Sequence, residues 1–371
     1  MISLIGLCCA GCAVLAVLVW RRLKRGSPQK KCGIMFTGTG TSSGAPMIRC
    51  VIGGEGGVPG CKSCSVAIRN GRRDPNWRNN VGLLIRWLHA DGRWRHIQID
   101  CGKTFRESVM TWYKDHEIHY LDAVLLTHDH ADAIFGLDEL RQLQRYDPVR
   151  RQVQGPPMQC YCDVRTMRHC RRAFPYLFGH FGQKEGLIAL SRAWCNCTDD
   201  CDVECQDRQA NFLPEKQSRF VAAIDWKEIP EDTSPFEVDN LKLHALPVLH
   251  GADYVSFGYG FGPPGSRVVY ISDYSQILPR TEKLLEQWSK EGIAVMILDM
   301  LHPDSKKSNV HANLDESVSL IKRFRPQKAF LVGMGHYREH HDMNRQLRDL
   351  WFTDGLDIQL AHDGLFVPLQ I

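Results

Sequence analysis

The sequence predicts an α/β fold, built as one layered domain over residues 33–371. Short apolar, β-branched runs alternate with amphipathic helical patterns along most of this span. The alternation resumes beyond an irregular, Cys-rich stretch at about 150–240, so we interpret that stretch as an insertion within one domain. A chain of 371 residues, 43% of them hydrophobic, is long enough to bury a large core.

Residues 1–20 are predicted to form a transmembrane anchor. Ile2 to Trp20 is an uncharged, mostly apolar run, close to the roughly 20 residues that a helix needs to span a bilayer. A basic linker at 21–32 follows it and, by the positive-inside tendency, would keep the folded body in the cytosol. The alternative is a cleaved signal and a secreted or luminal body, but such a signal carries its positive charges before the apolar run. Three cysteines in the run are either apolar fillers or acylation sites: Cys8, Cys9 and Cys12.

The body is expected to contain strands in both halves of the chain, with helices between them. Each expected strand is a short apolar run bounded by turn-forming residues: Gly33–Thr37, Val81–Leu88, His96–Asp100, Ala123–Thr127, Leu241–Val248, Tyr254–Phe261, Arg267–Asp273, Ala294–Asp299 and Ala329–Gly333. Apolar residues at helical spacing predict helices near 104–115, 133–145, 279–290, 312–324 and 341–351.

Charge and cysteine content restrict the function only weakly. The net charge of +4 is small for this length, so composition does not indicate nucleic-acid binding. The 15 cysteines are clustered; a cytosolic body would keep them as thiols or metal thiolates, whereas secretion would favour disulfides. The spacing C-x-C-x3-C-x3-C in the expected insertion favours a local metal or disulfide staple over an inert loop: Cys195, Cys197, Cys201 and Cys205.

The segment Thr127-His128-Asp129-His130-Ala131-Asp132 carries the first candidate metal ligands. It follows the apolar strand that begins at Ala123 and leads into a helix. Two imidazoles one residue apart on extended backbone point to the same side, so both can bind one metal, and the Asp two positions later suits a harder neighbouring ion. Taken alone, the pattern is equally consistent with polar residues that cap the next helix.

Three further candidate ligands come directly after apolar strands elsewhere in the chain: His250, Asp273 and His336. Each alone would be an ordinary loop or capping residue. Because α/β folds gather their sites at the carboxyl edge of the sheet, their joint recurrence at strand ends predicts a metal centre there.

This order of motifs resembles the metallo-β-lactamase superfamily. Within it, the chain is similar to the branch containing the bacterial phosphonate-pathway cyclic phosphodiesterase. Phe36-Thr-Gly-Thr-Gly-Thr-Ser-Ser-Gly-Ala-Pro46 resembles that branch's first strand and Gly-rich turn, and Ile99-Asp-Cys-Gly102 resembles its second motif. The resemblance implies a four-layer αββα sandwich and a metal-dependent hydrolase, with the expected membrane anchor added at the N-terminus.

The resemblance also implies a set of ligands. His128, His130 and His250 would bind a first zinc ion, Asp273 would bridge two ions, and Asp132 and His336 would bind a second, zinc or manganese. The family motif has a second-metal histidine where this chain has Ala133, a variant similar to a eukaryotic subgroup with His-Ala-Asp-Ala. Asp132 and His311 are the expected catalytic residues, since the histidine corresponding to His311 acts on the phosphate or leaving group. His302 lies in the same segment and either supports His311 or has no role in the site.

A second, structural zinc site is implied by three cysteines near the start of the body: Cys50, Cys61 and Cys64. In the resembling branch the fourth ligand follows the last catalytic histidine, which makes His340 the expected residue, with His341 as the alternate. A closed, thiolate-rich site leaves no position for water and is therefore structural. The alternatives are three free thiols or a reactive C-x-x-C dithiol, for which no thioredoxin-like context exists.

The expected activity is hydrolysis of a small phosphodiester or nucleotide-like substrate by a metal-activated water. One alternative is an RNA-processing nuclease of the same superfamily, for which the Arg-rich stretch from Arg145 to Arg172 would serve as a basic arm; nucleic acid is not the favoured partner. The other is a membrane-tethered metal-binding or scaffold protein whose catalytic centre was weakened at Ala133.

Overall fold

A computed structural model describes residues 31–53, 60–149, 152–178, 221–304 and 308–371 of the chain. The chain divides into two compact units, Met1–Lys31 and Cys32–Ile371, and every described helix and strand belongs to the second. The predicted anchor at 1–20 and the cysteine cluster Cys195–Cys205 lie outside the described residues. No described helix combines the length and the apolar character needed to cross a membrane, and on this finding the prediction of a membrane-anchored protein is corrected.

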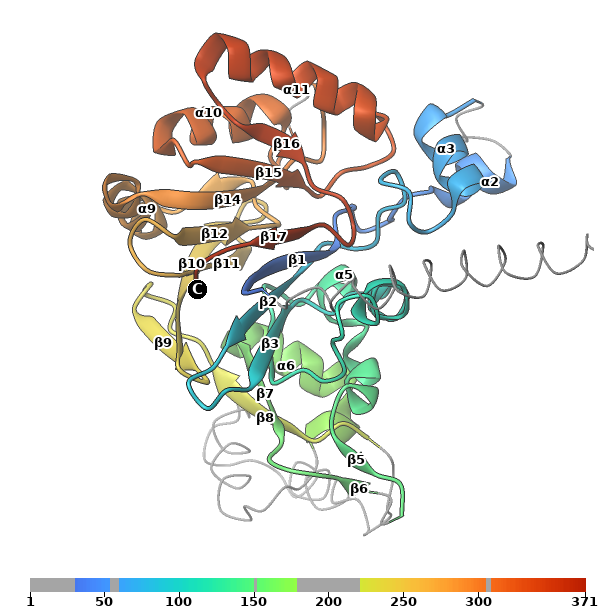
Figure 1. The fold of residues 1–371 in the computed structure, drawn as a ribbon, viewed down its shortest axis with the longest axis vertical. Helices are drawn as coiled ribbons and strands as arrows, with labels where there is room; N and C mark the ends of the chain where they lie inside the picture. The colour runs from blue at the N-terminus through green and yellow to red at the C-terminus, as the bar shows by residue number, and fades with distance from the viewer. Residues whose placement is uncertain (1–30, 54–59, 150–151, 179–220, 305–307) are drawn as a thin grey trace, which may run out of the picture. The chain divides into compact units, whose positions relative to one another are not determined.

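Two mixed β-sheets form the framework of the described residues (Figure 1). The first has the order β17-β1-β2-β3-β4-β7-β8, with bounds Phe366–Pro368, Gly33–Gly38, Gly82–Leu88, Trp94–Ile99, Ala123–Leu125, Met158–Cys162 and Ile224–Glu228. The second has the order β13-β10-β11-β12-β14-β15-β16, with bounds Gln276–Ile277, Leu241–Leu249, Val255–Phe261, Arg267–Ile271, Ile293–Asp299, Lys328–Val332 and Ile358–Leu360. Strand β9 (Pro235–Val238) pairs with β10, and β5 (Tyr146–Asp147) pairs with β6 (Gln152–Val153).

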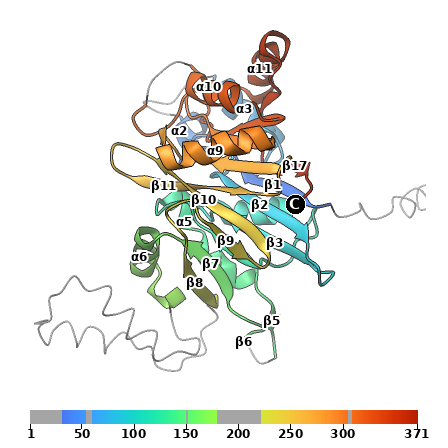
Figure 2. The ribbon, with the colours of Figure 1, turned by 90° about the vertical axis from the view of Figure 1, so that its left-hand side faces the viewer.

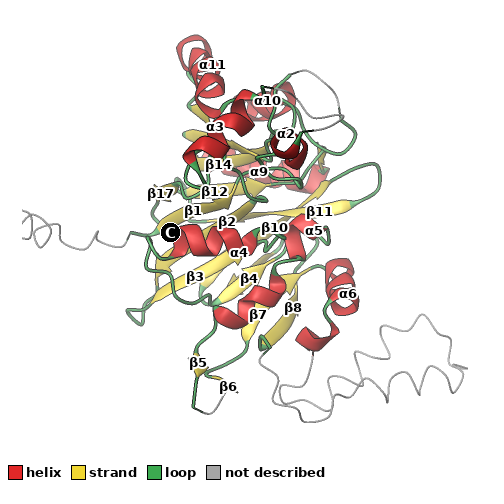
Figure 3. Ribbon diagram, turned by 90° about the vertical axis from the view of Figure 1, so that its right-hand side faces the viewer, coloured by secondary structure: helices red, strands yellow, loops and turns green. Residues whose placement is uncertain are grey.

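The helices lie against these sheets or in the loops between them. On the side of the first sheet are α4 (Phe105–Ser108), a π-helical turn (Val109–Tyr113), α5 (Ala131–Ile134), a 3₁₀ helix (Leu137–Gln142), α6 (Val164–Ala173) and a second 3₁₀ helix (Pro175–Phe178) (Figure 3). On the side of the second are α9 (Pro279–Glu291), α10 (Leu314–Phe324) and α11 (His340–Asp354) (Figure 2). Two short helices, α2 (Ile48–Ile52) and α3 (Lys62–Asn70), follow β1.

Three apolar clusters hold the layers together. The central one lies between the sheets and joins β1 and β2 to β10–β12, for example through Phe36 and Tyr259. One outer cluster packs α4–α6 against the first sheet, and the other packs α9–α11 against the second, with Trp288 among its fully buried side chains. An α/β sandwich of two sheets results, as the sequence predicts.

Each predicted apolar run forms a buried strand, and the predicted bounds are confirmed to within two residues at each end. The helix predicted near 133–145 differs: it begins at Ala131, breaks at Gly136 and continues as a 3₁₀ helix. A Cβ at Gly136 would lie 2.4 Å from the Gly102 carbonyl oxygen, so the chain bends where these two backbones meet. Strands β7 and β8 also differ from expectation, because they extend the first sheet inside the stretch interpreted as an insertion. Cys160 and Cys162 of β7 pack as small apolar residues.

Candidate metal centre

The carboxyl ends of strands from both sheets meet at the centre. His128 and His130 follow β4 of the first sheet, whereas His250 and Asp273 follow β10 and β12 of the second. Two hydrogen bonds join the sheets at this point. The Tyr259 hydroxyl donates to the Leu126 carbonyl (2.6 Å), and the amide of Phe257 in β11 donates to the Thr127 carbonyl (2.9 Å). The two sheet edges are therefore fixed relative to each other where the ligands are presented.

Three histidines that the sequence analysis names as first-metal candidates converge there. One ring nitrogen from each of His128, His130 and His250 lies within 4.8 Å of the others. His128 and His250 are buried and His130 is exposed, so the cluster opens to solvent on one side. Burial lowers the pKa of all three, to about 3 for His128, which keeps the rings neutral and able to bind a metal.

Hydrogen bonds fix which ring nitrogen faces the cluster. Thr127 donates its hydroxyl hydrogen to Asp100 (2.8 Å), so its oxygen accepts from Nδ1 of His128 (2.7 Å). Nδ1 of His250 donates to the Val310 carbonyl (2.8 Å). Both rings therefore present an unprotonated Nε2, and Nε2 of His128 is buried with no hydrogen-bond partner among the described residues. This arrangement fits a bound divalent ion.

A carboxylate and a fourth histidine lie beside the cluster. Oδ2 of Asp273 is 3.9 Å from Nε2 of both His128 and His250, and His250, Asp273 and His311 form a second group with donor atoms within 4.8 Å. Nδ1 of His311 lies 2.6 Å from Oδ2 of the fully buried Asp299. Burial lowers the pKa of His311, but the attraction of Asp299 outweighs it and raises the pKa to about 9.

Asp132 is half-buried at the start of α5, near this carboxylate. Burial and the negative charge of Asp273 raise its pKa. Its backbone is held close to Gly102, where a Cβ would lie 1.9 Å from the Asp132 carbonyl oxygen. Asp132 does not belong to a group of donor atoms within 4.8 Å among the described residues. The side chain of Ala133 is buried in the apolar cluster under the first sheet.

The structure places His336 away from the position predicted for it. Its Nδ1 lies 3.4 Å from Sγ of Cys50 and 3.3 Å from Sγ of Cys61, and with Cys64 these residues form a compact four-residue group. His336 is therefore not positioned as a second-metal ligand but completes the cysteine site. Burial raises the pKa of the Cys64 thiol to about 12, and the nearby thiols add to the rise, so deprotonation there requires a compensating cation.

His340, the predicted fourth ligand of the cysteines, points elsewhere. It is the first residue of α11, whose start is fixed by Glu339 accepting from the backbone amides of His341 and Asp342. The buried His340 ring faces Asn344 (3.0 Å) and the C-terminal His362 instead of the thiols. Neither His340 nor the alternate, His341, joins a ligand group among the described residues.

Several residues that orient the ligands were not predicted from the sequence. Asp299 ends a predicted strand, as Asp273 does, and this shared position was a usable signal. No sequence signal indicated Tyr254. Its ring stacks on His130 with centroids 5.1 Å apart, and its hydroxyl donates to Asp129. The Arg165 guanidinium lies 3.8 Å from the centre of the Tyr254 ring, so this corner of the site is held from α6.

Comparisons with known proteins agree with this geometry. The chain is 23% identical over 302 residues to ribonuclease Z of Brevibacillus brevis, covering 74% of this chain and 86% of that one. It is 36% identical over 109 residues to an octanoyltransferase of Porphyromonas gingivalis, which is 29% of this chain and 18% of the length of that protein. The fold matches the crystal structure of a diphosphatase from the PhnP family with a TM-score of 0.63 and 24% identity, covering 92% of this chain and 99% of the other.

A family model described as the beta-lactamase superfamily domain matches residues 95–185 and 180–334, more than half of the chain. The matched span contains the histidine cluster, Asp273 and the His311–Asp299 pair. With the two-sheet sandwich around that centre, this match makes the chain a member of the metallo-β-lactamase superfamily of hydrolases.

Proposed function

We propose that this protein is a metal-dependent phosphodiesterase. The observation that carries the proposal is the pair of histidines whose Nδ1 atoms are occupied by hydrogen bonds while their Nε2 atoms face a common point, with a carboxylate-held histidine beside them. Hydrolysis of a phosphodiester requires an activated water and a group that protonates the leaving oxygen. The ligand cluster and His311 supply these two requirements side by side.

His128, His130 and His250 would hold a first ion, for which their nitrogen donors suit zinc. Asp273 would bridge to a second position, with Asp132 and His311 nearest to it, where the oxygen donors suit zinc or manganese. When bound, a divalent ion lowers the pKa of a water and stabilises negative charge on the phosphate. His336, with the three cysteines, would hold a separate structural zinc.

His311 is the candidate proton donor. Asp299 accepts from its Nδ1 and thereby fixes the ring, so Nε2 faces the region of Asp273 with a proton to give. A leaving alkoxide is too basic to depart readily without that proton. Asp299 acts only through His311 and is therefore a positioning residue.

A small phosphodiester or nucleotide-like substrate is proposed because the sequence motifs resemble the cyclic-phosphodiesterase branch of the superfamily. The test is a substrate screen on the full-length chain loaded with zinc or manganese, using bis(p-nitrophenyl) phosphate, 2′,3′-cyclic nucleotides, a thioester and a β-lactam. We expect turnover of phosphodiesters, lost in His130→Ala. Cleavage of the thioester or lactam without any phosphodiester turnover would exclude the assignment.

Ribonuclease activity is a second candidate, favoured by the basic helix α6. This helix carries Arg165 beside the Tyr254 ring, and further basic residues along it: Arg168, His169, Arg171 and Arg172. A phosphate backbone binds such side chains with a strong salt dependence. Binding of a structured RNA that weakens steeply with salt, together with its endonucleolytic cleavage, would favour the nuclease over the small-molecule enzyme.

A further inference from the structure

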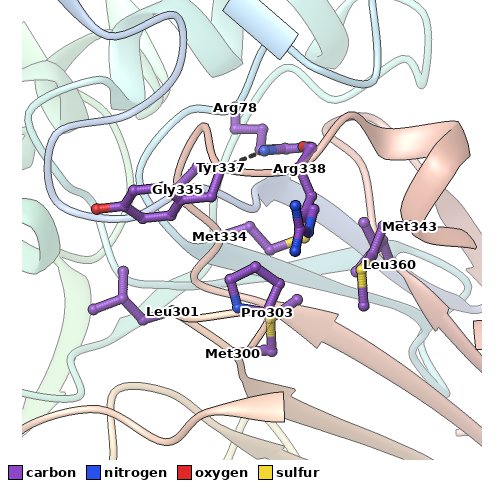
Figure 4. Close-up of a pocket in the computed structure, with 10 residues that line it drawn as sticks. All are labelled: Arg78, Met300, Leu301, Pro303, Met334, Gly335, Tyr337, Arg338, Met343 and Leu360. Carbon is purple, nitrogen blue, oxygen red and sulfur yellow. Dashed lines mark hydrogen bonds between the residues drawn. The ribbon is translucent and has the colours of Figure 1, made fainter. Parts of the chain in front are cut away.

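A pocket beside the loop that carries His336 is too small for a substrate group (Figure 4). Three buried methionines line it, Met300, Met334 and Met343, and the space between the side chains has room for about one water molecule. The surface next to the metal centre, by contrast, carries exposed basic and aromatic side chains beyond those that orient the ligands.

Helix α6 presents a basic face to solvent. Four of its exposed side chains are basic and recur at helical spacing, and we call them the basic stripe: Arg165, Arg168, His169 and Arg172. The opposite face is buried through Thr166, Met167 and Cys170, and the helix contains no acidic residue. At about 1.5 Å per residue the stripe is roughly 10 Å long, which matches about three phosphates of a stacked strand, spaced about 3.4 Å apart along its axis.

The basic stripe begins at the metal centre. The guanidinium of Arg165 lies 3.8 Å from the centre of the Tyr254 ring, which stacks on His130, the exposed histidine of the cluster. Nδ1 of His169 lies 3.2 Å from Oδ2 of Asp129, the residue that precedes His130. A phosphodiester chain that leaves the open side of the centre would therefore pass directly onto α6.

The far end of the stripe keeps its charge. Asp129 pairs with Arg165 (3.5 Å) as well as with His169, so the near end is partly neutralised. Arg172, two helical turns further on, is exposed and makes no ion pair with a residue that the structure describes. An added anion would gain most at this end.

Three aromatic rings adjoin the end of α6 and form what we call the aromatic platform: Phe135, Phe174 and Tyr176 (Figure 3). The ring centroids of Phe135 and Phe174 are 6.0 Å apart, and those of Phe174 and Tyr176 are 6.3 Å apart. Phe135 ends α5, the helix that His130 begins, and is 50% exposed. The Tyr176 hydroxyl donates to Asp138 (3.0 Å), which fixes that ring. Exposed rings of this kind bind nucleobases by stacking, with little dependence on sequence.

We propose that the basic stripe and the aromatic platform bind a single-stranded oligonucleotide whose scissile phosphodiester lies at the metal centre. The proposal rests on the ribonuclease activity given above as the second candidate, and it names the substrate of that activity as an unpaired strand. Successive phosphates lie along α6, and a base beyond them stacks on Phe135. Base-paired RNA binds less well, because its stacked bases offer no free face to the platform.

The test measures binding of two fluorescent octamers by anisotropy: octauridylate, and an abasic octamer that has the same phosphates and no bases. In Phe135→Leu we expect octauridylate to bind about tenfold more weakly, as for loss of one base stack, with no change for the abasic octamer. Arg172→Gln should weaken both and reduce the slope of log Kd against log salt by about 0.7, as for loss of one phosphate contact.

Two substitutions on α11 are the matched controls, because that helix packs against the other sheet. Phe352→Leu and Arg348→Gln remove an exposed ring and an exposed guanidinium and should change neither affinity nor salt slope. Equal binding of the two octamers by the wild type, or an unchanged salt slope in Arg172→Gln, overturns the proposal. If Phe135→Leu unfolds, Tyr176→Leu is judged by the same criteria.

Binding needs no turnover, so its outcome is separate from that of the hydrolase assignment. Base-dependent binding of octauridylate that is lost in Phe135→Leu supports the surface even if no phosphodiester is cleaved. Turnover of 2′,3′-cyclic nucleotides without any binding of octauridylate refutes the surface and leaves the phosphodiesterase assignment intact. Gel electrophoresis of the recovered probe verifies that the measured affinities belong to the uncleaved strand.

Discussion

Replacement of Thr127 by valine tests whether the histidine cluster is a preorganised metal site. Valine keeps the shape of threonine but removes the hydroxyl that donates to Asp100 and accepts from Nδ1 of His128. All three groups are buried, so nothing in the described residues replaces the lost bonds. The ring is then free to protonate Nε2 in place of Nδ1, and an Nε2–H cannot bind a metal.

The magnitude follows from the groups left without partners. Loss of an orienting partner of a ligating histidine weakens metal binding by roughly 10- to 100-fold, or about 1.4–2.8 kcal/mol. The unpaired nitrogen and carboxylate oxygen also destabilise the metal-free fold by about 1–3 kcal/mol. Both quantities are measurable on one preparation, by competition with a zinc chelator and by urea unfolding of the metal-free protein.

Thr127→Ser is the matched control, because serine keeps the hydroxyl and loses only a methyl group. We expect Thr127→Ser to bind zinc nearly as wild type does, at a small cost in stability. If valine and serine have the same zinc affinity, the hydroxyl does not orient His128, and the reasoning from the hydrogen-bond chain is refuted.

Three further outcomes are expected. Asp299→Asn should lower kcat with metal content unchanged. Because Asp299 raises the pKa of His311, the protonated form of His311, which donates the proton, exists to higher pH in wild type than in the variant. As pH rises, kcat of the variant should therefore fall at a lower pH than kcat of wild type. His336→Ala should lose one equivalent of zinc by elemental analysis, whereas His340→Ala should retain it; the reverse would contradict the assignment of the cysteine site. Gly102→Ala should lower the unfolding free energy by about 1–3 kcal/mol, because its Cβ would meet the Asp132 carbonyl, and unchanged stability would argue against that close approach.

The convergence of His128, His130 and His250 could be predicted from the sequence because the placement of each depends on local information. His128 and His130 share a face of extended backbone after a strand, and His250 ends another apolar run. Parallel and mixed sheets bring such strand ends to one edge, so recognising the strands was enough to place the ligands near each other. No knowledge of loop conformation was needed.

His336 and His340 could not be separated in this way. Both follow β15 within a few residues, and their spacing does not say which of them turns towards Cys50 and Cys61, which lie 286 and 275 positions from His336 in sequence. That choice is made by contacts remote in sequence: Arg78 holds the Gly335 carbonyl, and Asn76 accepts from the His340 amide (2.8 Å) at the start of α11. A family resemblance assigns a role to such a residue by its spacing in the sequence. A small change in loop length is therefore enough to exchange the roles of His336 and His340.

The place of His336 beside the cysteines bears on the second metal position, where this chain has Ala133. Ala133 stands where the family motif has a histidine ligand of the second metal. His336, the other histidine expected there, lies in the cysteine group, so the second position lacks both of these nitrogen donors. The histidine nearest to it is His311, yet Asp299 holds this ring with its proton, as a proton donor requires. Asp132 and Asp273 would then be the principal donors to the proposed second position, and two carboxylates would favour a hard, weakly held ion. On the proposed function, we therefore expect the first site to carry the affinity and the second to exchange its ion readily.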